Sequence, residues 1–496
     1  MRKVAGSNNF RVIQNGIFRC PVQSSASRGM DAKAENNNLE NISKVLNKVR
    51  DYFILVFTYI VYKTTRSIVT AFQKFTWGVT GVEKTRRDAR KGLNFKQSAH
   101  VQEIFWRRKI YNLEIADCSD FITFHKCFKP PSYVLQPNIS LYCMSKEEAV
   151  FIEVDERCNV YDSHDYRSLY MSQFFNAKRI ITMPLASFHK IAQDLGSPKI
   201  PVIWLSGTGR CGSTLLSRVF GAVPGCMVLE DPDALTNLAF LNKLNQFPDG
   251  EYDQLLISAV RLLCKPDDRA SMFVIRARPC CIVQIHKIHE FFPKVSHVFA
   301  YRNSLKTVSS FMGIINESSA LKILRTFVDN TLMATILPCI RRFLYNRFCY
   351  VLERDTNQIK ISDLTTFGII THSWALCLSR MSEEAEKGMP ILSILYEESI
   401  RNPRRTCTVL FERLRIRAQY LMNAVEAFKE DSRSEDFTTS FISNESRRTL
   451  PSELLAEADG ILKKYNLPKL GERFEMPGLL SIEPPFAKTP SRDILL

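Results

Sequence analysis

Residues 201–220 read PVIWLSGTGRCGSTLLSRVF, and this stretch decides the expected fold. The apolar run Val202–Leu205 predicts a buried strand, and a helical pattern follows a glycine-rich loop. Such a unit points backbone N–H groups and the positive end of a helix dipole at a phosphate. Gly207 and Gly212 have the spacing of the phosphate-binding G-x-x-x-x-G loop, but Ser213 stands where nucleotide hydrolases require lysine. Arg210, inside the loop, supplies a cation instead.

The sequence after Pro201 alternates short apolar runs with helical segments. The runs VIWL, MVLE, MFVIR and HVFAYR are each followed by a helical pattern, and a last run, Ile391–Tyr396, precedes a helix near Pro403. This alternation predicts an α/β fold, a three-layer parallel sheet of the P-loop type with helices on both faces. Ligands of such sheets bind beyond the carboxyl ends of the strands.

Composition divides the 496 residues into four regions. Residues 1–40 are polar and are expected to be a disordered, basic N-terminus. Residues 41–110 are expected to form a basic helical segment. Residues 111–184 are rich in β-branched and aromatic residues between turn signals, which predicts a small β-rich accessory region. The α/β domain is expected to span residues 185–496.

The net charge of +16 comes mainly from the N-terminal region. Residues 1–110 hold 21 Lys and Arg against 7 Asp and Glu, a surplus of 14 that leaves only +2 for the rest. A solvated basic tail, contact with an anionic membrane or nucleic acid, and a cleaved targeting segment are all open interpretations. The apolar stretch Tyr52–Tyr62 is too short to span a bilayer, so a helix lying on a surface or packed in a core is expected there.

The expected partners and location follow from the same pattern. Membrane-surface contact is expected through residues 41–92, and no nucleic-acid partner is expected. The 14 cysteines show no C-x-x-C and no zinc-ligand spacing, which indicates a reducing compartment and no metal. The expected location is the cytoplasm, with the Golgi membrane or an organelle reached through a transit segment as alternatives.

A second informative segment follows the strand pattern that ends at Tyr301. In a nucleotide hydrolase such a strand would usually end in a metal-binding aspartate, whereas Arg302 follows here. Ser310 lies two helical turns further on, so both side chains can converge on one anion beside the glycine loop. An arginine at a strand end is more often a surface residue, so this pair is informative only together with the loop.

Together, the two segments resemble the sulfotransferase family. In that family a [K/R]-[ST]-G-[ST]-T loop holds the 5′-phosphosulfate of 3′-phosphoadenosine-5′-phosphosulfate (PAPS), and an R-(x)7-S pair holds the 3′-phosphate. Residues 210–214 match the loop, with Cys211 in place of the commoner serine, and Arg302 and Ser310 match the pair. The resemblance covers roughly residues 185–440 and is nearest to a branch with the loop G-T-G-R-x-G-S-T-L-L. A glycine-rich C-terminal adenosine loop has no counterpart here.

The resemblance implies a set of donor-binding residues. Arg276 ends an apolar run, similar to a family strand whose last residue is a cation facing the donor. Tyr396, Glu397 and Glu398 resemble a family Y-E-D segment, with glutamate where aspartate is usual. The implied PAPS-binding residues are Gly207, Thr208, Gly209, Arg210, Cys211, Gly212, Ser213, Thr214, Arg276, Arg302 and Ser310.

The implied reaction moves a sulfuryl group from PAPS to a hydroxyl or amine acceptor by in-line displacement and leaves 3′,5′-diphosphoadenosine (PAP). Arg210 is placed to stabilise the leaving group. The base is Asp231, which stands where the family usually has a glutamate before proline, or its neighbour Glu230. Two other interpretations stay open: Asp231 caps the following helix, and His286 or His289 provides the base.

Two other classes of function compete with the sulfotransferase interpretation. A P-loop kinase or nucleotide hydrolase fits the glycine spacing but lacks the lysine and the acidic strand end. A catalytically silent PAP-binding protein fits the aspartate at position 231. The sequence identifies no acceptor, which is expected to be a small molecule, a glycan or a protein.

Overall fold

The computed structural model describes residues 30–480, apart from 111–113, 162–167, 249, 318, 355–358 and 435–449. The chain divides into two compact units, Met1–Leu55 and Val56–Leu496. Every described residue of the first unit belongs to helix α1 (Met30–Val79), whose later half belongs to the second. Most of the segment expected to be disordered, residues 1–29, lies outside the described residues.

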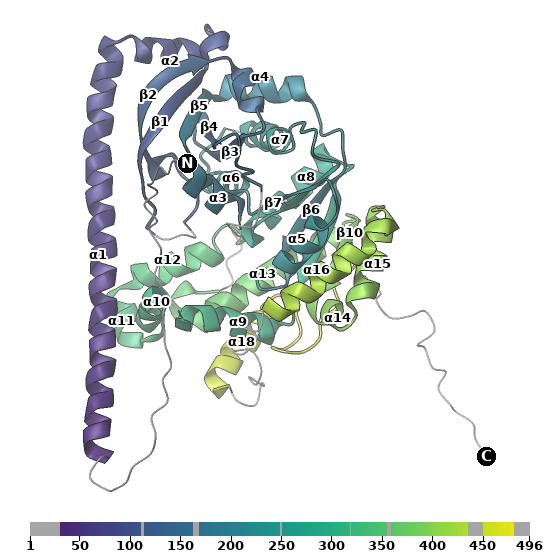
Figure 1. Cartoon of the computed structure of the whole chain (residues 1–496). Coiled ribbons are helices and arrows are strands. Elements are labelled where there is room, and N and C mark those ends of the chain that lie inside the picture. Colours follow the sequence, from purple (N-terminus) through teal and green to yellow (C-terminus); the bar gives the residue numbers. More distant parts are fainter. Residues whose placement is uncertain are drawn as a thin grey trace, which may run out of the picture. The chain divides into compact units, whose positions relative to one another are not determined.

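The second unit is built around a parallel sheet of five strands (Figure 1). The strand order is β10-β9-β6-β8-β7, and each neighbouring pair is parallel. From the central strand β6 the chain goes to the edge strand β7, returns to β8 beside β6, and then crosses to β9 and β10 on the other side. The strands are β6 (Val202–Gly207), β7 (Cys226–Glu230), β8 (Met272–Arg276), β9 (Ser296–Tyr301) and β10 (Ile391–Leu395).

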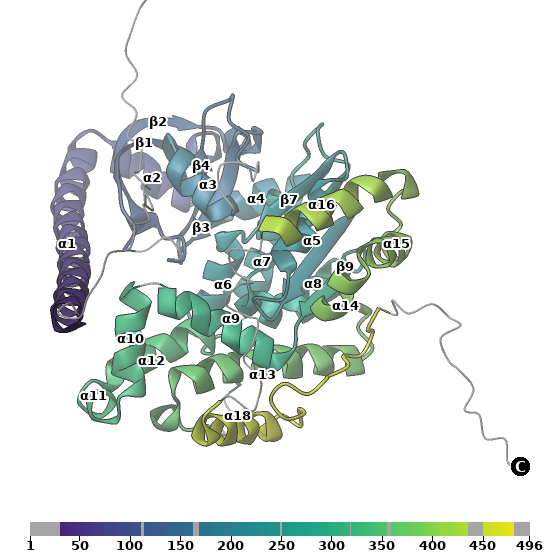
Figure 2. The same ribbon diagram turned by 60° about the horizontal axis from the view of Figure 1, so that its bottom comes forward.

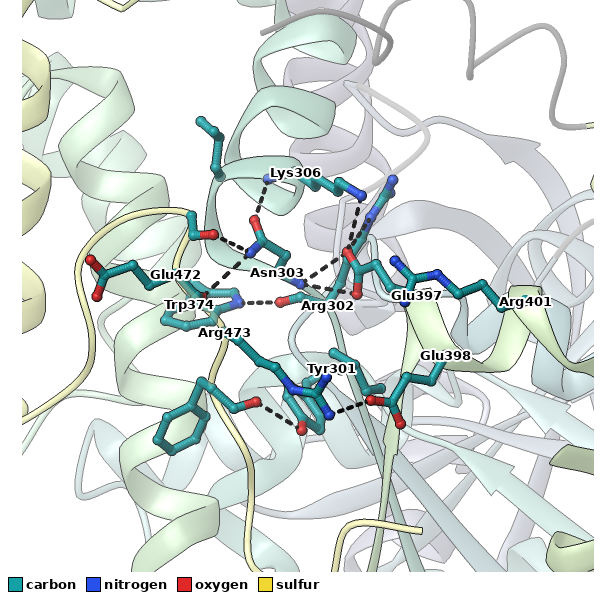
Figure 3. A pocket seen from close by; sticks show the side chains of 14 residues that line it. Tyr301, Arg302, Asn303, Lys306, Trp374, Glu397, Glu398, Arg401, Glu472 and Arg473 are labelled. Carbon is teal, nitrogen blue, oxygen red and sulfur yellow. Dashed lines mark hydrogen bonds and ion pairs between the residues drawn. The ribbon is translucent and has the colours of Figure 1, made fainter. Parts of the chain in front are cut away.

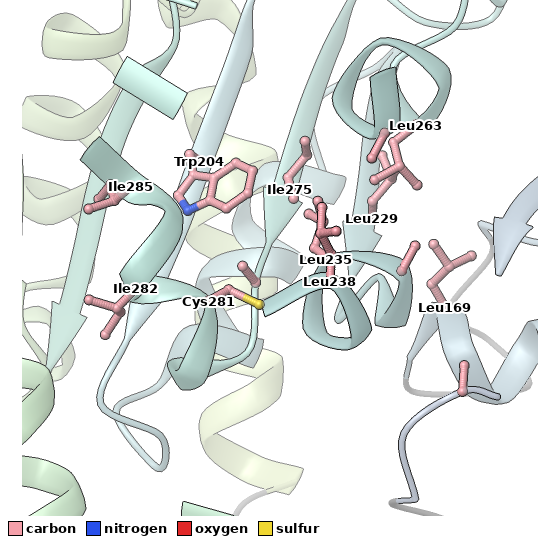
Figure 4. Close-up of a cluster of buried hydrophobic side chains, with 14 of the residues drawn as sticks. Leu169, Trp204, Leu229, Leu235, Leu238, Leu263, Ile275, Cys281, Ile282 and Ile285 are labelled. Atoms are coloured by element: carbon pink, nitrogen blue, oxygen red, sulfur yellow. The ribbon is translucent and has the colours of Figure 1, made fainter. Parts of the chain in front are cut away.

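Helices cover both faces of this sheet (Figure 2). Alternate residues of β6 point into two different cores: Val202 and Trp204 into one, Ile203 and Leu205 into the other. Figure 4 shows the Trp204 side of the sheet. The predicted α/β fold with a parallel sheet is thus confirmed. One face carries α5 (Ser213–Gly221), α15 (Pro403–Leu414) and α16 (Leu421–Ser434), and the other α6 (Asp233–Lys243), α7 (Glu251–Leu263), α8 (Ile285–Phe291) and α13 (Thr366–Glu386).

A second sheet of five antiparallel strands has the order β2-β1-β5-β4-β3. Its first strand lies inside residues 41–110, so the helical prediction is wrong for residues 99–107. The strand forms there because a partner strand is available, which the local pattern does not show. The strands are β1 (Ala99–Arg107), β2 (Phe121–Lys129), β3 (Ile139–Met144), β4 (Glu148–Glu153) and β5 (Arg179–Pro184).

The two sheets share a hydrophobic core. Ile152 of β4 and Trp204 of β6, both fully buried, belong to one continuous cluster, with α6 and α7 packed against β3. Polar contacts add to this packing: Asn237 Oδ1 of α6 accepts a hydrogen bond from the Met144 backbone N–H at 2.9 Å. The β-rich region is therefore part of the same compact unit as the parallel sheet.

The later half of α1 covers the free edge of β2. Tyr62 Oη donates to the Ser119 carbonyl at 3.0 Å, Arg66 Nε donates to the Phe121 carbonyl at 3.3 Å, and Gln73 Nε2 donates to the Thr123 carbonyl. The last two contacts occupy carbonyl groups of an edge strand that could otherwise pair with another chain. Among the described residues, no helix has the length and hydropathy required of a membrane span.

In the parallel sheet, the edge at β10 is covered by residues 478–480. The Ser393 N–H donates to the Gly478 carbonyl at 2.9 Å, and the Leu480 N–H donates to the Ser393 carbonyl at 2.8 Å. The remaining helices of the described chain are α2 (Val82–Arg90), α3 (Leu169–Asn176), α4 (Leu185–Leu195), α9 (Ser304–Glu317), α10 (Ser319–Asp329), α11 (Thr331–Ile336), α12 (Pro338–Phe348), α14 (Tyr396–Arg401) and α18 (Ser452–Lys464).

Candidate functional site

The glycine loop connects the central strand β6 to the N-terminus of α5. Gly209, Arg210 and Gly212 all have left-handed backbone conformations, with φ of 73°, 52° and 79°. A Cβ atom at Gly212 would lie 2.4 Å from Cδ2 of Tyr396, so only glycine fits there. The loop is therefore tight, and its last residue leads directly into Ser213, the first residue of α5. The first N–H groups of a helix have no partner within the helix and can bind an anion.

The Cys211 side chain packs beneath this loop. The side chain is buried, and a Cβ atom at Gly207 would lie 2.5 Å from its Sγ. Burial raises the pKa of the Cys211 thiol, which therefore stays protonated at neutral pH. The departure from the commoner serine thus concerns packing beneath the loop.

Arg210, Arg302 and Ser310 come together at the carboxyl ends of β6 and β9. Arg210 Nε donates to Ser310 Oγ at 2.9 Å, and Arg302 Nη1 donates to the Arg210 carbonyl at 3.4 Å. Arg302 and Ser310 are both buried. Residues from the loop, from a strand end and from the second turn of α9 thus form one cationic group.

Side chains from α13 and α14 fix Arg302 in place. Its guanidinium Cζ lies 4.7 Å from the centre of the Tyr396 ring, and its Nε lies 3.8 Å from Glu397 Oε1. Trp374 Nε1 donates to the Arg302 carbonyl at 3.0 Å. Arg302 Nε is buried and has no hydrogen-bond partner among the described residues. Glu397 at 3.8 Å pairs with its charge but is too far for a hydrogen bond. A buried donor without a hydrogen bond is costly, so an anion within hydrogen-bond distance would satisfy it.

A cavity of about 350 Å³ opens beside Arg302, at the carboxyl ends of β9 and β10 (Figure 3). One wall is the C-terminal segment Gly471–Phe474, which Asn303 anchors by donating from Nδ2 to the Gly471 carbonyl at 2.8 Å. Arg473 in this wall pairs with Glu398 of α14 at 2.6 Å. Sequence reasoning missed this wall, because no local motif links residues 471–474 to a strand end 170 positions earlier.

Glu230 and Asp231 lie at the end of β7 and share one arginine. Arg276 Nη2 lies 2.9 Å from Glu230 Oε2 and 2.9 Å from Asp231 Oδ2, and its Nη1 donates to Thr214 Oγ1 at 3.3 Å. The guanidinium of Arg276 thus pairs with the two carboxylates, and its contact with a donor stays a prediction. It also connects them to the start of α5 through Thr214.

The two carboxylates differ in exposure. The Glu230 side chain is 9% exposed and that of Asp231 is 20% exposed. Burial raises the pKa of Glu230 above its usual range, although Arg276 lowers it in part. Asp231 has a left-handed backbone with φ of 52°, and its N–H donates to the Arg276 carbonyl at 2.7 Å. Asp231 is therefore the more accessible carboxylate.

The structure also bears on two alternative roles, Asp231 as a helix cap and His286 or His289 as the base. The N-cap of α6 is Pro232 without a side-chain cap, so Asp231 does not cap this helix. His286 is exposed and pairs with Glu384 of α13 at 2.9 Å, while His289 packs edge-to-face on His297. Neither histidine contact involves the loop. No group of three or more His, Cys, Asp and Glu residues in the described chain could hold a metal ion.

Comparisons with known proteins add only a distant likeness of fold. Neither a scan against protein-family models nor a search of curated proteins finds a match. The sulfotransferase STF9 from Mycobacterium avium is 12% identical, with a TM-score of 0.32 over 57% of this chain and 83% of that chain. The sulfotransferase domain from the Synechococcus PCC 7002 olefin synthase is 11% identical, with a TM-score of 0.31 over 54% and 95%. At these values the likeness assigns no activity to this chain.

Proposed function

We propose that the chain is a sulfotransferase that moves a sulfuryl group from PAPS to a hydroxyl or amine acceptor. The observation that carries this proposal is the convergence of Arg210, Arg302 and Ser310 beside a tight glycine loop. A loop at a helix N-terminus is suited to one phosphate group. The buried Arg302 and Ser310 offer a second anion site next to it, which suits a nucleotide phosphorylated at both ends.

The residues of the site fit the two ends of such a donor. In this proposal the loop from Gly207 to Thr214 holds the 5′-phosphosulfate by backbone N–H groups. Arg302 and Ser310 hold the 3′-phosphate, and the buried Arg302 Nε gains the acceptor that it lacks among the described residues. Tyr396 stacks on the Arg302 guanidinium and keeps it from turning away.

The proposed chemistry needs one base and one fixed cation. The acceptor oxygen or nitrogen attacks sulfur, a new bond to sulfur forms, and the bond from sulfur to the bridging phosphate oxygen breaks as PAP leaves. Arg210 stabilises the negative charge that develops on the bridging oxygen. Asp231 accepts the acceptor proton, because it is more exposed than Glu230 and is positioned by Arg276.

The binding test compares PAP, ATP and GDP by titration calorimetry on the full chain. We expect PAP to bind more tightly than ATP. A charge-assisted contact contributes about 1.5–3 kcal/mol, so Arg302→Ala should weaken PAP binding by roughly ten- to a hundred-fold. Arg404→Ala removes the same charge from an exposed position on α15 and serves as the control. Equal affinity for PAP and ATP, or magnesium-dependent ATP turnover, would show a kinase or nucleotide hydrolase instead.

The turnover test assigns the base. Transfer of labelled sulfate from PAPS to a panel of hydroxyl and amine acceptors is compared in Asp231→Asn and Glu230→Gln. Asp231→Asn should lower turnover by about a hundred-fold or more while PAP affinity stays the same. If Glu230→Gln alone stops turnover, Glu230 is the base. PAP binding without transfer to any acceptor would indicate a catalytically silent protein.

A further inference from the structure

Helix α1 carries a continuous apolar stripe on its exposed side, away from the antiparallel sheet. Within residues 57–79 the stripe contains large apolar side chains with exposed fractions from 40% for Val61 to 75% for Val79. At 100° per residue these positions fall within one sector, about 120° wide and about 33 Å long. The stripe consists of Phe57, Ile60, Val61, Ile68, Phe72, Phe75 and Val79, with Thr64, Ala71 and Gly78 between them.

The opposite side of α1 holds the helix against the sheet, so the stripe cannot turn inward. Tyr62 is fully buried, stacks edge-to-face on Trp106 at 5.1 Å and donates to the Ser119 carbonyl. Gln73 is buried as well and bonds to the Thr123 carbonyl. These anchors lie about 150° around the helix from the centre of the stripe. An exposed apolar band of this length on a protein surface indicates an interaction site.

The charges around the stripe are mainly positive. Lys63 and Lys74, eleven positions apart, lie on the same border of the stripe. The next helix, α2, and the residue after it add the exposed Lys84, Arg87 and Lys91. Residues 56–92 hold eight basic and two acidic side chains, namely Lys63, Arg66, Lys74, Lys84, Arg86, Arg87, Arg90 and Lys91 against Glu83 and Asp88. Of these, Arg66 bonds to the Phe121 carbonyl and Arg86 and Arg90 pair with Glu148. The positive charge offered to a partner therefore comes mainly from the exposed Lys74, Lys84, Arg87 and Lys91.

A second copy of the chain fits the stripe poorly. A coiled coil needs large apolar residues every seven positions at both seam positions. Two seven-residue registers put Val61, Ile68 and Phe75 at one seam position. The other seam position then holds either Thr64, Ala71 and Gly78 or Thr58, Thr65, Phe72 and Val79. In the second register the first half of the seam carries two threonines, and Phe57 and Ile60 remain outside it. A broad, straight stripe that includes two large aromatic rings in its second half suits a flat surface better.

We infer that the later half of α1 binds an anionic lipid bilayer, lying in the plane of its surface. The phenylalanine and aliphatic side chains of the stripe enter the headgroup region, and the basic residues beside them contact the phosphate and carboxylate groups of the lipids. This mode leaves the anchors on the sheet intact, because only the exposed side of the helix enters the lipid. It is independent of the proposed sulfuryl transfer.

The test is sedimentation of the full chain with vesicles of phosphatidylcholine, with and without phosphatidylserine. We expect binding to the phosphatidylserine vesicles that weakens at high salt. The double variant Phe72→Gln, Phe75→Gln should lower the partition coefficient about ten-fold or more. Phe343→Gln makes the same change at an exposed position of α12 and should have no effect. Because all three side chains are exposed, circular dichroism should show an unchanged fold.

A charge variant separates lipid binding from other uses of the stripe. Lys84→Glu with Arg87→Glu should lower binding to phosphatidylserine vesicles about ten-fold and leave the weak binding to neutral vesicles unchanged. Light scattering measures the oligomeric state of the same proteins. Dimers that the Phe72 and Phe75 changes dissociate, without vesicle binding, would overturn the inference in favour of a second copy. If the chain neither binds vesicles nor forms dimers, the inference is overturned as well.

Discussion

At the scale of single residues, Gly212 and Gly250 have nearly the same backbone conformation in different surroundings. Their φ angles are 79° and 81°, but a Cβ atom at Gly212 would meet the Tyr396 ring, whereas at Gly250 nothing lies within 4 Å. Alanine at either position has a backbone strain of about 1–2 kcal/mol. At Gly212 the clash adds about 1–3 kcal/mol. Chemical denaturation should therefore show Gly212→Ala to be clearly the less stable variant.

The same pair tests the coupling between the loop and Arg302. A displaced Tyr396 ring can no longer stack on the Arg302 guanidinium, so Gly212→Ala should also weaken PAP binding. Gly250→Ala should leave PAP affinity unchanged. Equal stability of the two variants would contradict the close contact between the loop and Tyr396.

Sequence reasoning predicted which residues of the candidate site come together, but not how all of them pair. Arg302 and Ser310 were predicted to lie beside the loop, and the structure brings them to Arg210. A strand end and the helical period determine the relative positions of residues that are only a few turns apart in the sequence. The partner of Arg276 could not be predicted in this way. Its charge is taken by Glu230 and Asp231 from a neighbouring strand, and which strands are neighbours is set by packing of the whole sheet.

At the scale of elements, the C-terminal segment is both an edge cover and a cavity wall. Removal of residues 468–496 would expose the edge of β10 and open the cavity beside Arg302. We expect this truncated chain to aggregate and to bind PAP more weakly. A chain ending at Leu480 retains every described contact of the segment and is the matched control. Size-exclusion chromatography and PAP titration measure the two effects, and equal behaviour of both chains would contradict this role.

Elements were predicted best where the local pattern was strong. The five apolar runs after Pro201 correspond to the five strands of the parallel sheet, because buried parallel strands are continuous apolar runs. The strand Ala99–Arg107 was missed, because it carries five exposed or half-exposed residues in a row, from Glu103 to Arg107, and takes its conformation from β2 and β5. Pairing over such distances leaves little trace in a local window.

At the scale of the whole molecule, the shared core predicts a single unfolding transition for the second unit. Ile152→Ala in the antiparallel sheet should destabilise the unit by about 2–5 kcal/mol. Trp77 and Trp106 report on that sheet, whereas Trp204 and Trp374 report on the parallel sheet and α13. The measurement uses two proteins, each of which retains one of these tryptophan pairs. Ile152→Ala should shift the denaturation midpoint seen by tryptophan fluorescence equally in both proteins. A shift seen only by Trp77 and Trp106 would indicate two independently folding domains.

Each sheet has one edge strand that another segment covers. The segment that covers β2 comes before it in the sequence, whereas the segment that covers β10 comes after it, and this order matters during synthesis. The later half of α1 leaves the ribosome before β2, so the antiparallel edge is covered once its strand has formed. Residues 478–480 emerge about 80 residues after β10. At about 5–20 residues per second, this edge stays open for roughly 4–16 s on each ribosome. On crowded polysomes, nascent chains at this stage are the ones that most need a chaperone.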